Sequence, residues 1–147
     1  MSGLVSPGDI VHLYFRSITP QKHKLAVVAC LSPRPGFFLI NSRIPGYVTR
    51  RPELVAANVK IHSSEHRCLT HDSFINTAEM FGEYTSDDLN TALQSASAVR
   101  RESISARCQD RMLRAIRESR LLPQVKKDWV YAAFQVGSDE PEESATR

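Results

Sequence analysis

Short apolar segments separated by strong turn signals fill the first half of the chain, and they constrain its fold more than any other feature. Proline and glycine break regular structure, so turns are predicted at three places: Pro7-Gly8-Asp9, Pro33-Arg34-Pro35-Gly36 and Pro45-Gly46. Each segment between these turns is rich in β-branched and aromatic side chains, which is typical of a strand. We expect strands at residues 10–15, 24–30, 37–42, 54–61 and 72–76.

The second half of the chain changes to a helical period, over residues 86–136. Thr85 is suited to cap the first helix, and Asp87 and Asp88 suit the positive end of its dipole. Apolar side chains then recur every three or four residues, as on one face of a helix: Leu89, Ala92, Leu93 and Ala96; Ile104, Cys108, Met112, Ala115 and Ile116; Val125, Trp129 and Ala133. We expect these faces to pack on the strands or on a partner.

The close spacing of the strands favours a small antiparallel barrel over an alternating parallel sheet. The predicted fold class is therefore α+β and mainly β, with a barrel over residues 5–82 and a C-terminal helical extension over residues 86–136. The 147 residues are enough for one domain, which we place at residues 1–136. Residues 137–147 are acidic and lack large apolar groups, so we expect a disordered tail.

Composition indicates the compartment. The three cysteines are too few and too widely spaced for a disulfide framework. No apolar run is long enough to span a bilayer, and the first residues do not have the pattern of a secretory signal. We therefore expect a cytoplasmic protein that has no membrane partner.

Positive charge is concentrated in one part of the chain. The net charge is only +3, yet residues 100–127 hold nine basic and three acidic residues. Arginines spaced three or four apart in this stretch share one helix face: Arg107, Arg111, Arg114 and Arg117. Such a row can bind RNA phosphates or receive an acidic segment, from a partner protein or from the chain's own tail. The alternative is a solvated helix face without a partner.

The sequence can be searched for the motifs of known enzyme classes and of metal sites. No glycine-rich phosphate loop and no Gly-x-Ser-x-Gly motif occurs, which disfavours nucleotide-binding and α/β-hydrolase enzymes. Four potential zinc ligands lie close together, but their spacing matches no standard zinc pattern: His62, His66, Cys68 and His71. Surface histidines and a half-buried cysteine are the alternative, and we predict no metal and no cofactor. Asp72 is expected to accept backbone N–H bonds in a turn.

Polar side chains at the ends of two predicted strands form a sharper pattern. His23 and Lys24 lie where a polar loop enters the second strand, and Ser42 and Arg43 lie where the third strand ends. A cation, an imidazole and a hydroxyl can act on a phosphate ester by charge stabilisation, proton transfer and orientation of an oxygen. They can cleave RNA without a metal, because the RNA 2′-hydroxyl is an internal nucleophile. An ordinary hairpin with solvated ends is the alternative.

Five segments form an ordered series: Pro7-Gly8-Asp9-Ile10-Val11, Lys24-Leu25-Ala26-Val27-Val28, Phe38-Leu39-Ile40-Asn41-Ser42, His71-Asp72-Ser73-Phe74-Ile75, and the acid-capped helix over residues 87–98. This series resembles the MazF/PemK/Kid family of toxins. In that family a Gly-Asp opening strand precedes an Arg-Pro-hydrophobic strand, a strand that ends in Ser or Thr, and an Asp-Ser segment. The resemblance covers about residues 5–98, and its specificity lies in the series, since each motif is short.

The resemblance implies an SH3-like barrel, usually a homodimer, that acts as the toxin of a type II toxin–antitoxin pair. The implied activity is that of a metal-independent endoribonuclease on single-stranded RNA, and the implied protein partner is an antitoxin. Lys24 occupies the position of the family's acid–base residue, and Ser42 that of its assisting hydroxyl. The loop from Arg16 to His23 takes the place of the RNA-binding loop.

The candidate residues follow from these two lines of reasoning together. His23, which is adjacent to Lys24, can carry out the proton transfer in place of Lys24, because imidazole titrates near neutral pH. The catalytic candidates are therefore Lys24, Ser42 and His23. The RNA-binding candidates are the cations of the loop, of the third strand's end and of the basic helix: Arg16, Lys22, Arg43, Arg107, Arg111 and Arg114.

Departures from the family pattern keep a second function open. Lys24-Leu25 stands where the family has Arg-Pro, and lysine lacks the planar fork with which arginine binds a phosphate at two points. The basic extension from Arg100 to Trp129 has no role that the resemblance supplies. The alternative is a non-catalytic SH3-like barrel that binds protein or nucleic acid.

Overall fold

The computed structural model describes residues 4–138 of the chain. The strands are β1 (Asp9–Phe15), β2 (Lys22–Cys30), β3 (Gly36–Asn41), β4 (Asn58–Ile61), β5 (Ser73–Asn76) and β6 (Val99–Ser103). The helices are α1 (Gly46–Thr49), α2 (Pro52–Ala57), α3 (Ser86–Gln94), α4 (Ala106–Glu118) and α5 (Gln124–Ser138), and η1 (Ser63–Glu65) is a short 3-10 turn.

Six strands form one sheet in the order β4-β5-β3-β2-β1-β6, and every neighbouring pair is antiparallel. Within residues 4–138 no strand pairs with the outer side of β4 or of β6, so this sheet is open and does not close into a barrel. The predicted α+β class with antiparallel strands is confirmed, and the predicted closure of the sheet is not found. Lys22 and His23, expected in a loop, belong to β2.

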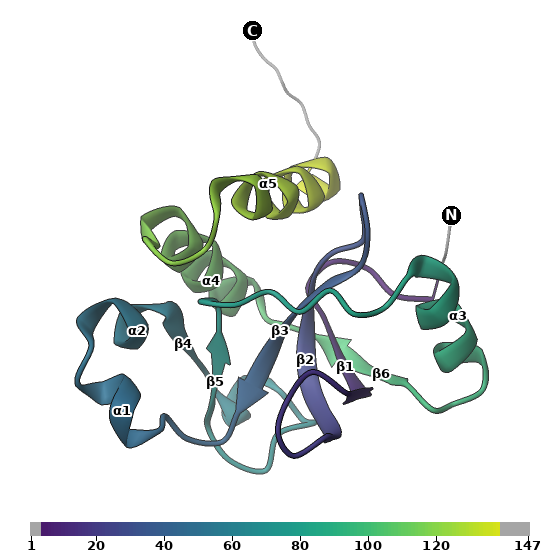
Figure 1. Ribbon diagram of the computed structural model, residues 1–147, viewed down its shortest axis with the longest axis horizontal. Coiled ribbons are helices and arrows are strands. Elements are labelled where there is room, and N and C mark those ends of the chain that lie inside the picture. Colours follow the sequence, from purple (N-terminus) through teal and green to yellow (C-terminus); the bar gives the residue numbers. More distant parts are fainter. Residues whose placement is uncertain (1–3, 139–147) are drawn as a thin grey trace, which may run out of the picture.

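Both faces of the sheet carry apolar side chains that helices cover. Helices α4 and α5 lie together over one face (Figure 1), where their apolar side chains join the buried cluster that includes Ile10 and Phe38. Helix α3 lies at the other end of the sheet, where Leu89 packs with Val11 and Leu39 of the opposite face. The expectation that the helical apolar faces pack on the strands is confirmed for α3 and α4. On α5 the buried apolar side chains are Val130 and Phe134, and Val125, which was predicted on the packed face, is 53% exposed.

The predicted fourth strand over residues 54–61 is wrong over half of its length. Helix α2 takes the residues up to Ala57, and only Asn58–Ile61 form strand β4. Pro52 lies in the first turn of α2, where its missing N–H would have no partner in the helix, and Glu53 adds an acid near the positive helix end. Val55, which a strand over 54–61 would place on the same face as the buried Val59 and Ile61, is 41% exposed.

The region of helical period predicted over residues 86–136 contains a strand that was not predicted. Helix α3 ends at Gln94, and Ala96 takes a positive φ of 65° that turns the chain back toward the sheet. Strand β6 then pairs with β1 over Val99–Ser103. Its pairing continues beyond the strand, because the N–H of Ile104 donates to the carbonyl of Gly8 at 2.9 Å. β6 therefore depends on a partner strand far away in sequence, which a local pattern does not reveal.

Hydroxyl side chains cap the starts of α3 and α4. Oγ1 of Thr85 accepts a hydrogen bond from the N–H of Asp88 at 3.0 Å, as predicted. Oγ of Ser105 does the same for Cys108 at 3.1 Å at the start of α4. Helix α5 runs to Ser138, beyond the predicted limit of 136, and the rest of the predicted tail, residues 139–147, lies outside the described residues. No helix within residues 4–138 is both long and apolar enough to cross a bilayer.

Candidate functional site

The loop end of the β1–β2 hairpin carries four of the nine predicted site residues, namely Arg16, Lys22, His23 and Lys24, and strand alternation divides them between the two faces. Leu13 pairs with Lys24, and Tyr14 pairs with His23. Paired residues point to the same face, and successive residues point to opposite faces. Lys24 therefore shares a face with the buried Leu13, whereas His23 shares the other face with Tyr14. The two neighbouring candidates, Lys24 and His23, diverge.

Lys24 is held against the end of β3. Its Nζ donates a hydrogen bond to Oδ1 of Asn41 at 2.5 Å, so the start of β2 and the end of β3 meet as the sequence predicts. The side chain is half-buried, and this burial, with the nearby charge of Lys22, lowers the pKa of Lys24 below its usual range. Desolvation and a like charge both disfavour the protonated amine. An anion placed between these two amines would relieve both effects.

Ser42 and Arg43, directly after β3, are exposed. Ser42 lines a small hollow of about 190 Å³, together with Leu25 and His71. Leu25 lies on the face of the sheet opposite to Lys24. The start of β2 and the end of β3 lie side by side, so the structure brings Ser42 close to Lys24, but the two side chains lie on opposite faces of the sheet.

The loop that follows β1 is anchored by Glu83. Its carboxylate accepts hydrogen bonds from the backbone N–H of Arg16 at 2.7 Å and of Ser17 at 3.3 Å, and also from the Ser17 hydroxyl. The hydroxyl of Tyr84 donates to the carbonyl of Tyr14 at 2.5 Å and ties the same segment to the strand end. The loop therefore begins from a fixed backbone, which is what a binding loop on a rigid scaffold needs.

A pocket of about 410 Å³ opens beside this anchored loop. Arg16 and His23 both line it, as predicted for a shared site. The remaining lining comes from the strand end, the segment after β5 and helix α3 with the turn after it: Tyr14, Glu83, Tyr84, Asp88, Thr91, Ala92, Ser95 and Ser97. The pocket thus combines a cation, an imidazole, a phenol and hydroxyls, with the carboxylates Glu83 and Asp88 on its wall. Lys22, the residue before His23 in β2, is exposed.

His12 is a neighbour of this pocket that sequence reasoning missed. Its ring stacks on the ring of His23, with centroids 5.2 Å apart and an angle of 21° between the planes. The ring of Tyr14 meets His23 edge-on, also at 5.2 Å. Burial lowers the pKa of His12, and the charges of His23 and Arg101 lower it further. The available signal was the alternation of strand residues, which puts positions 12, 14 and 23 on one face once β1 and β2 are paired.

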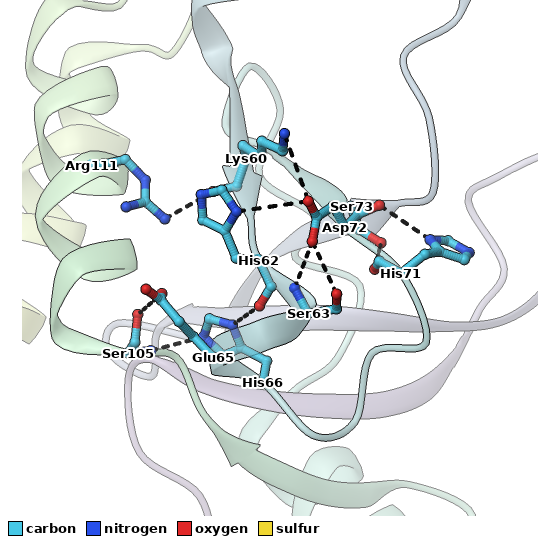
Figure 2. Close-up of polar contacts among 10 residues, drawn as sticks. All are labelled: Lys60, His62, Ser63, Glu65, His66, His71, Asp72, Ser73, Ser105 and Arg111. Atoms are coloured by element: carbon cyan, nitrogen blue, oxygen red, sulfur yellow. Dashed lines mark hydrogen bonds and ion pairs between the residues drawn. The ribbon is translucent and has the colours of Figure 1, made fainter.

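The histidine-rich segment after β4 is a structural network (Figure 2). His66 is 1% exposed, and both of its ring nitrogens are used. Nδ1 lies 2.7 Å from the carbonyl oxygen of His62, and Nε2 accepts the backbone N–H of Ser105 at 2.9 Å. Nδ1 must therefore carry the proton, and no ring lone pair remains for a metal. His66 instead fixes the start of α4 to this segment.

Asp72 has the turn-forming role that the sequence predicts. Its carboxylate accepts hydrogen bonds from the N–H and the hydroxyl of Ser63 at 2.9 and 3.0 Å. It also lies 3.7 Å from Nζ of Lys60 and 3.8 Å from Nδ1 of His62. The Ser63 hydrogen bonds, helped by these cations, lower the pKa of Asp72. Within the described part of the chain, no three His, Cys, Asp or Glu side chains are grouped so as to hold a metal ion.

The predicted arginine row on α4 is shorter than expected. Arg107, Arg114 and Arg117 are exposed, as predicted. Arg111 is half-buried and donates from Nη2 to the carbonyl oxygen of Lys60 at 3.2 Å, so it ties α4 to β4. The reason is its position at the edge of the apolar face of α4, where the helix meets β4. The solvent-facing row therefore consists of three arginines.

Neither a protein-family model nor a curated protein matches this chain. What the site can do follows from its own residues. Imidazoles can exchange protons near neutral pH, and the cations Arg16, Lys22 and Lys24 can hold phosphates. Both kinds of group lie at one end of a rigid hairpin.

Proposed function

We propose that this protein is a metal-independent endoribonuclease that cleaves single-stranded RNA, as the toxin of a type II toxin–antitoxin pair. One observation carries the proposal: the loop end of the β1–β2 hairpin gathers His23 and Lys24 with the cations Arg16 and Lys22, beside a pocket of about 410 Å³. RNA supplies its own nucleophile, the 2′-hydroxyl. Its cleavage therefore needs proton transfer and charge stabilisation but no activated water.

The cations have separable roles in this proposal. Lys22 and Lys24 share one face of β2 and repel each other, which lowers the pKa of Lys24. A phosphate bound between them offsets that repulsion, so Lys24 supplies charge stabilisation to the RNA from the face of β2 opposite to His23. Arg16, at the pocket, and Arg43, after β3, bind neighbouring phosphates of the strand. Ser42 assists by orienting an oxygen.

The proposal extends to the architecture and to the partners. The open antiparallel sheet is taken as a variant of the SH3-like barrel, and the active form as a cytoplasmic homodimer, on the strength of the motif series alone. Three free cysteines fit a reducing compartment. The exposed arginines of α4, Arg107, Arg114 and Arg117, suit the acidic segment of an antitoxin or the RNA itself.

Cleavage of a single-stranded RNA in the presence of EDTA tests this proposal. The expected products end in a 2′,3′-cyclic phosphate and a 5′-hydroxyl, because the 2′-oxygen attacks the phosphorus and the 5′-oxygen leaves. A strand with deoxyribose at the cut site should stay intact. Cleavage of that deoxy strand would rule out the proposed mechanism.

A second function is favoured by one observation at Lys24. Its amine already donates to Asn41, and the chain has Lys24-Leu25 where the family has Arg-Pro. Both features suit a domain that binds nucleic acid or protein without cutting it. Under this alternative the protein shifts the labelled RNA in a gel, and the recovered RNA is full-length.

A further inference from the structure

His12 and His23 form a pair across the two strands that the sequence did not suggest. His12 lies opposite Leu25 and His23 opposite Tyr14, so the two histidines are diagonal neighbours on one face of the sheet. Their ring centroids are 5.2 Å apart. A hydrogen bond to a reacting oxygen spans about 2.6–3.2 Å. Two rings at this separation can therefore reach two different oxygens of a single phosphodiester.

The electrostatics of the pair disfavour protonation of both rings at once. Each imidazolium makes protonation of its neighbour less favourable. His12 is the more buried of the two, being half-buried whereas His23 is exposed, and burial is the largest cause of its lowered pKa. His12 is accordingly the ring that stays neutral near pH 7, ready to accept a proton. His23 is the ring of the pair that solvent reaches more easily.

The groups that face the pair come from strands β1 and β6. Tyr14 of β1 contacts His23 edge-on and donates from its hydroxyl to Gln21. Arg101 of β6 is close enough for its charge to lower the pKa of His12. An RNA phosphate near Arg101 would neutralise that charge and orient the scissile linkage at the two rings. No acidic side chain has a resolved effect on the pKa of His12 within residues 4–138.

We propose that His12 and His23 are the two proton-transfer residues of the RNA cleavage, with His12 as general base and His23 as general acid. This inference rests on the proposed function. Nε2 or Nδ1 of neutral His12 takes the proton of the 2′-hydroxyl while the 2′-oxygen forms a bond to phosphorus. The bond from phosphorus to the 5′-oxygen breaks, and protonated His23 gives its proton to that oxygen. The products are a 2′,3′-cyclic phosphate and a 5′-hydroxyl, and solvent returns each ring to its starting protonation state.

The test compares His12→Phe and His23→Phe with wild type, because phenylalanine keeps a stacked aromatic ring and removes the proton site. His71→Phe is the matched control, since His71 is exposed and lies outside the pair. Two substrates are used: normal RNA, and RNA with a 5′-bridging sulfur at the cut site. A thiolate leaves without protonation, so this second substrate needs a base but no acid. Binding of an uncleavable 2′-deoxy strand reports whether each variant is folded and holds nucleic acid.

On normal RNA both pair variants should lose about 10²–10⁴-fold in single-turnover rate, while the deoxy strand still binds and His71→Phe cuts like wild type. The sulfur substrate should restore the rate of His23→Phe but not of His12→Phe. The rise of the wild-type rate with pH on the acidic side should vanish in His12→Phe. Wild-type rates in either pair variant, or rescue of His12→Phe by sulfur, would overturn this inference and leave the proposed function standing. A wild-type protein that binds but does not cut either substrate would overturn both.

Discussion

Asp9 and Arg100, which are separated by 91 positions in sequence, form a two-point ion pair between the start of β1 and strand β6. Nε of Arg100 lies 2.9 Å from Oδ2 of Asp9, and Nη2 lies 3.3 Å from Oδ1. The same carboxylate accepts the backbone N–H of Ser6 and the hydroxyl of Ser103, each at 2.8 Å. The aspartate of the opening Pro-Gly-Asp turn thus holds the edge strand in place, and Arg100 has a structural role within the basic stretch.

Arg100→Gln is expected to destabilise the fold. The Asp9 side chain is only 6% exposed, so loss of the guanidinium leaves a buried carboxylate with two donors instead of four. A buried polar group left partly unsatisfied costs about 1–3 kcal/mol, and the 45% exposure of Arg100 places the effect toward the lower end. Urea unfolding measures it. Arg101→Gln, at the exposed neighbouring position, is the control, and equal midpoints for the two variants would contradict the structural role of the ion pair.

Lys24→Ala is expected to lower RNA cleavage about a hundredfold or more, as loss of one charge-stabilising donor does. The half-buried Lys24 contributes little to the core, so thermal unfolding should change far less than the rate. Ser42→Ala should cost less, because that hydroxyl only orients an oxygen. Full activity in Lys24→Ala would move charge stabilisation to Arg16 or Arg43.

The cleavage rate at alkaline pH should depend on the protonation of Lys24. Burial and Lys22 lower its pKa, so the amine loses its proton at a lower pH than a free lysine does. On RNA with a 5′-bridging sulfur at the cut site, which needs no general acid, the rate is expected to fall on the alkaline side as that proton is lost. In Lys24→Arg the guanidinium stays charged, and the alkaline fall should move to higher pH. An unchanged alkaline limb in this variant would show that Lys24 does not set it.

All three cysteines are expected to be unreactive in the folded protein. Burial raises the pKa of Cys30 and of Cys108 to about 11, and burial together with Glu102 raises that of Cys68 to about 12. The thiolate is the reactive form, so at pH 8 very little of any thiol can react. Titration with a disulfide reagent should be slow in buffer and fast in denaturant. Fast modification of the half-buried Cys68 in the folded protein would contradict this prediction.

Asp72→Asn should remove a pH-dependent part of the stability. Hydrogen bonds from Ser63 lower the pKa of Asp72 in the folded state, so the folded protein binds its proton less readily than the unfolded chain does. The stabilisation is therefore present above the unfolded pKa of about 3.9, and it is lost as the pH falls through the lower folded value. Unfolding free energies of wild type and variant should differ at pH 7 and converge in acid. A difference that stays constant with pH would contradict the assigned cause.

The accuracy of the sequence-based prediction varied with how local each signal is. Strands β1, β2, β3 and β5 were found because runs of β-branched and aromatic residues lie between proline and glycine turns. β6 was missed because Val99–Ser103 is a strand only by pairing with β1. At the site, sequence placed His23 and Lys24 together, since they are adjacent, but strand alternation separates them. His12 became visible only through the register of β1 and β2, and Arg111 left the exposed row because α4 packs on β4.

The exposed arginines of α4 lead to a prediction about salt. Arg107, Arg114 and Arg117 face solvent, whereas Arg111 is tied to Lys60. If RNA phosphates bind the three exposed side chains, replacing all three by glutamine should weaken binding of every sequence alike. For a single strand, each lost phosphate contact flattens the plot of log affinity against log salt by about 0.7, so three contacts give about 2. Arg111→Gln is the control and should leave the slope unchanged.

Deletion of residues 139–147 separates RNA binding from competition by the chain's own acids. These residues lie outside the described part of the structure, and they hold four acids and one arginine. If they compete with RNA for the α4 arginines, the deletion should tighten binding. The gain should be largest at low salt, where charges are least screened, and it should disappear when the three arginines are already glutamine. Superimposable binding curves for the intact chain, the deletion and the triple variant at two salt concentrations would leave this helix face without a role in RNA binding.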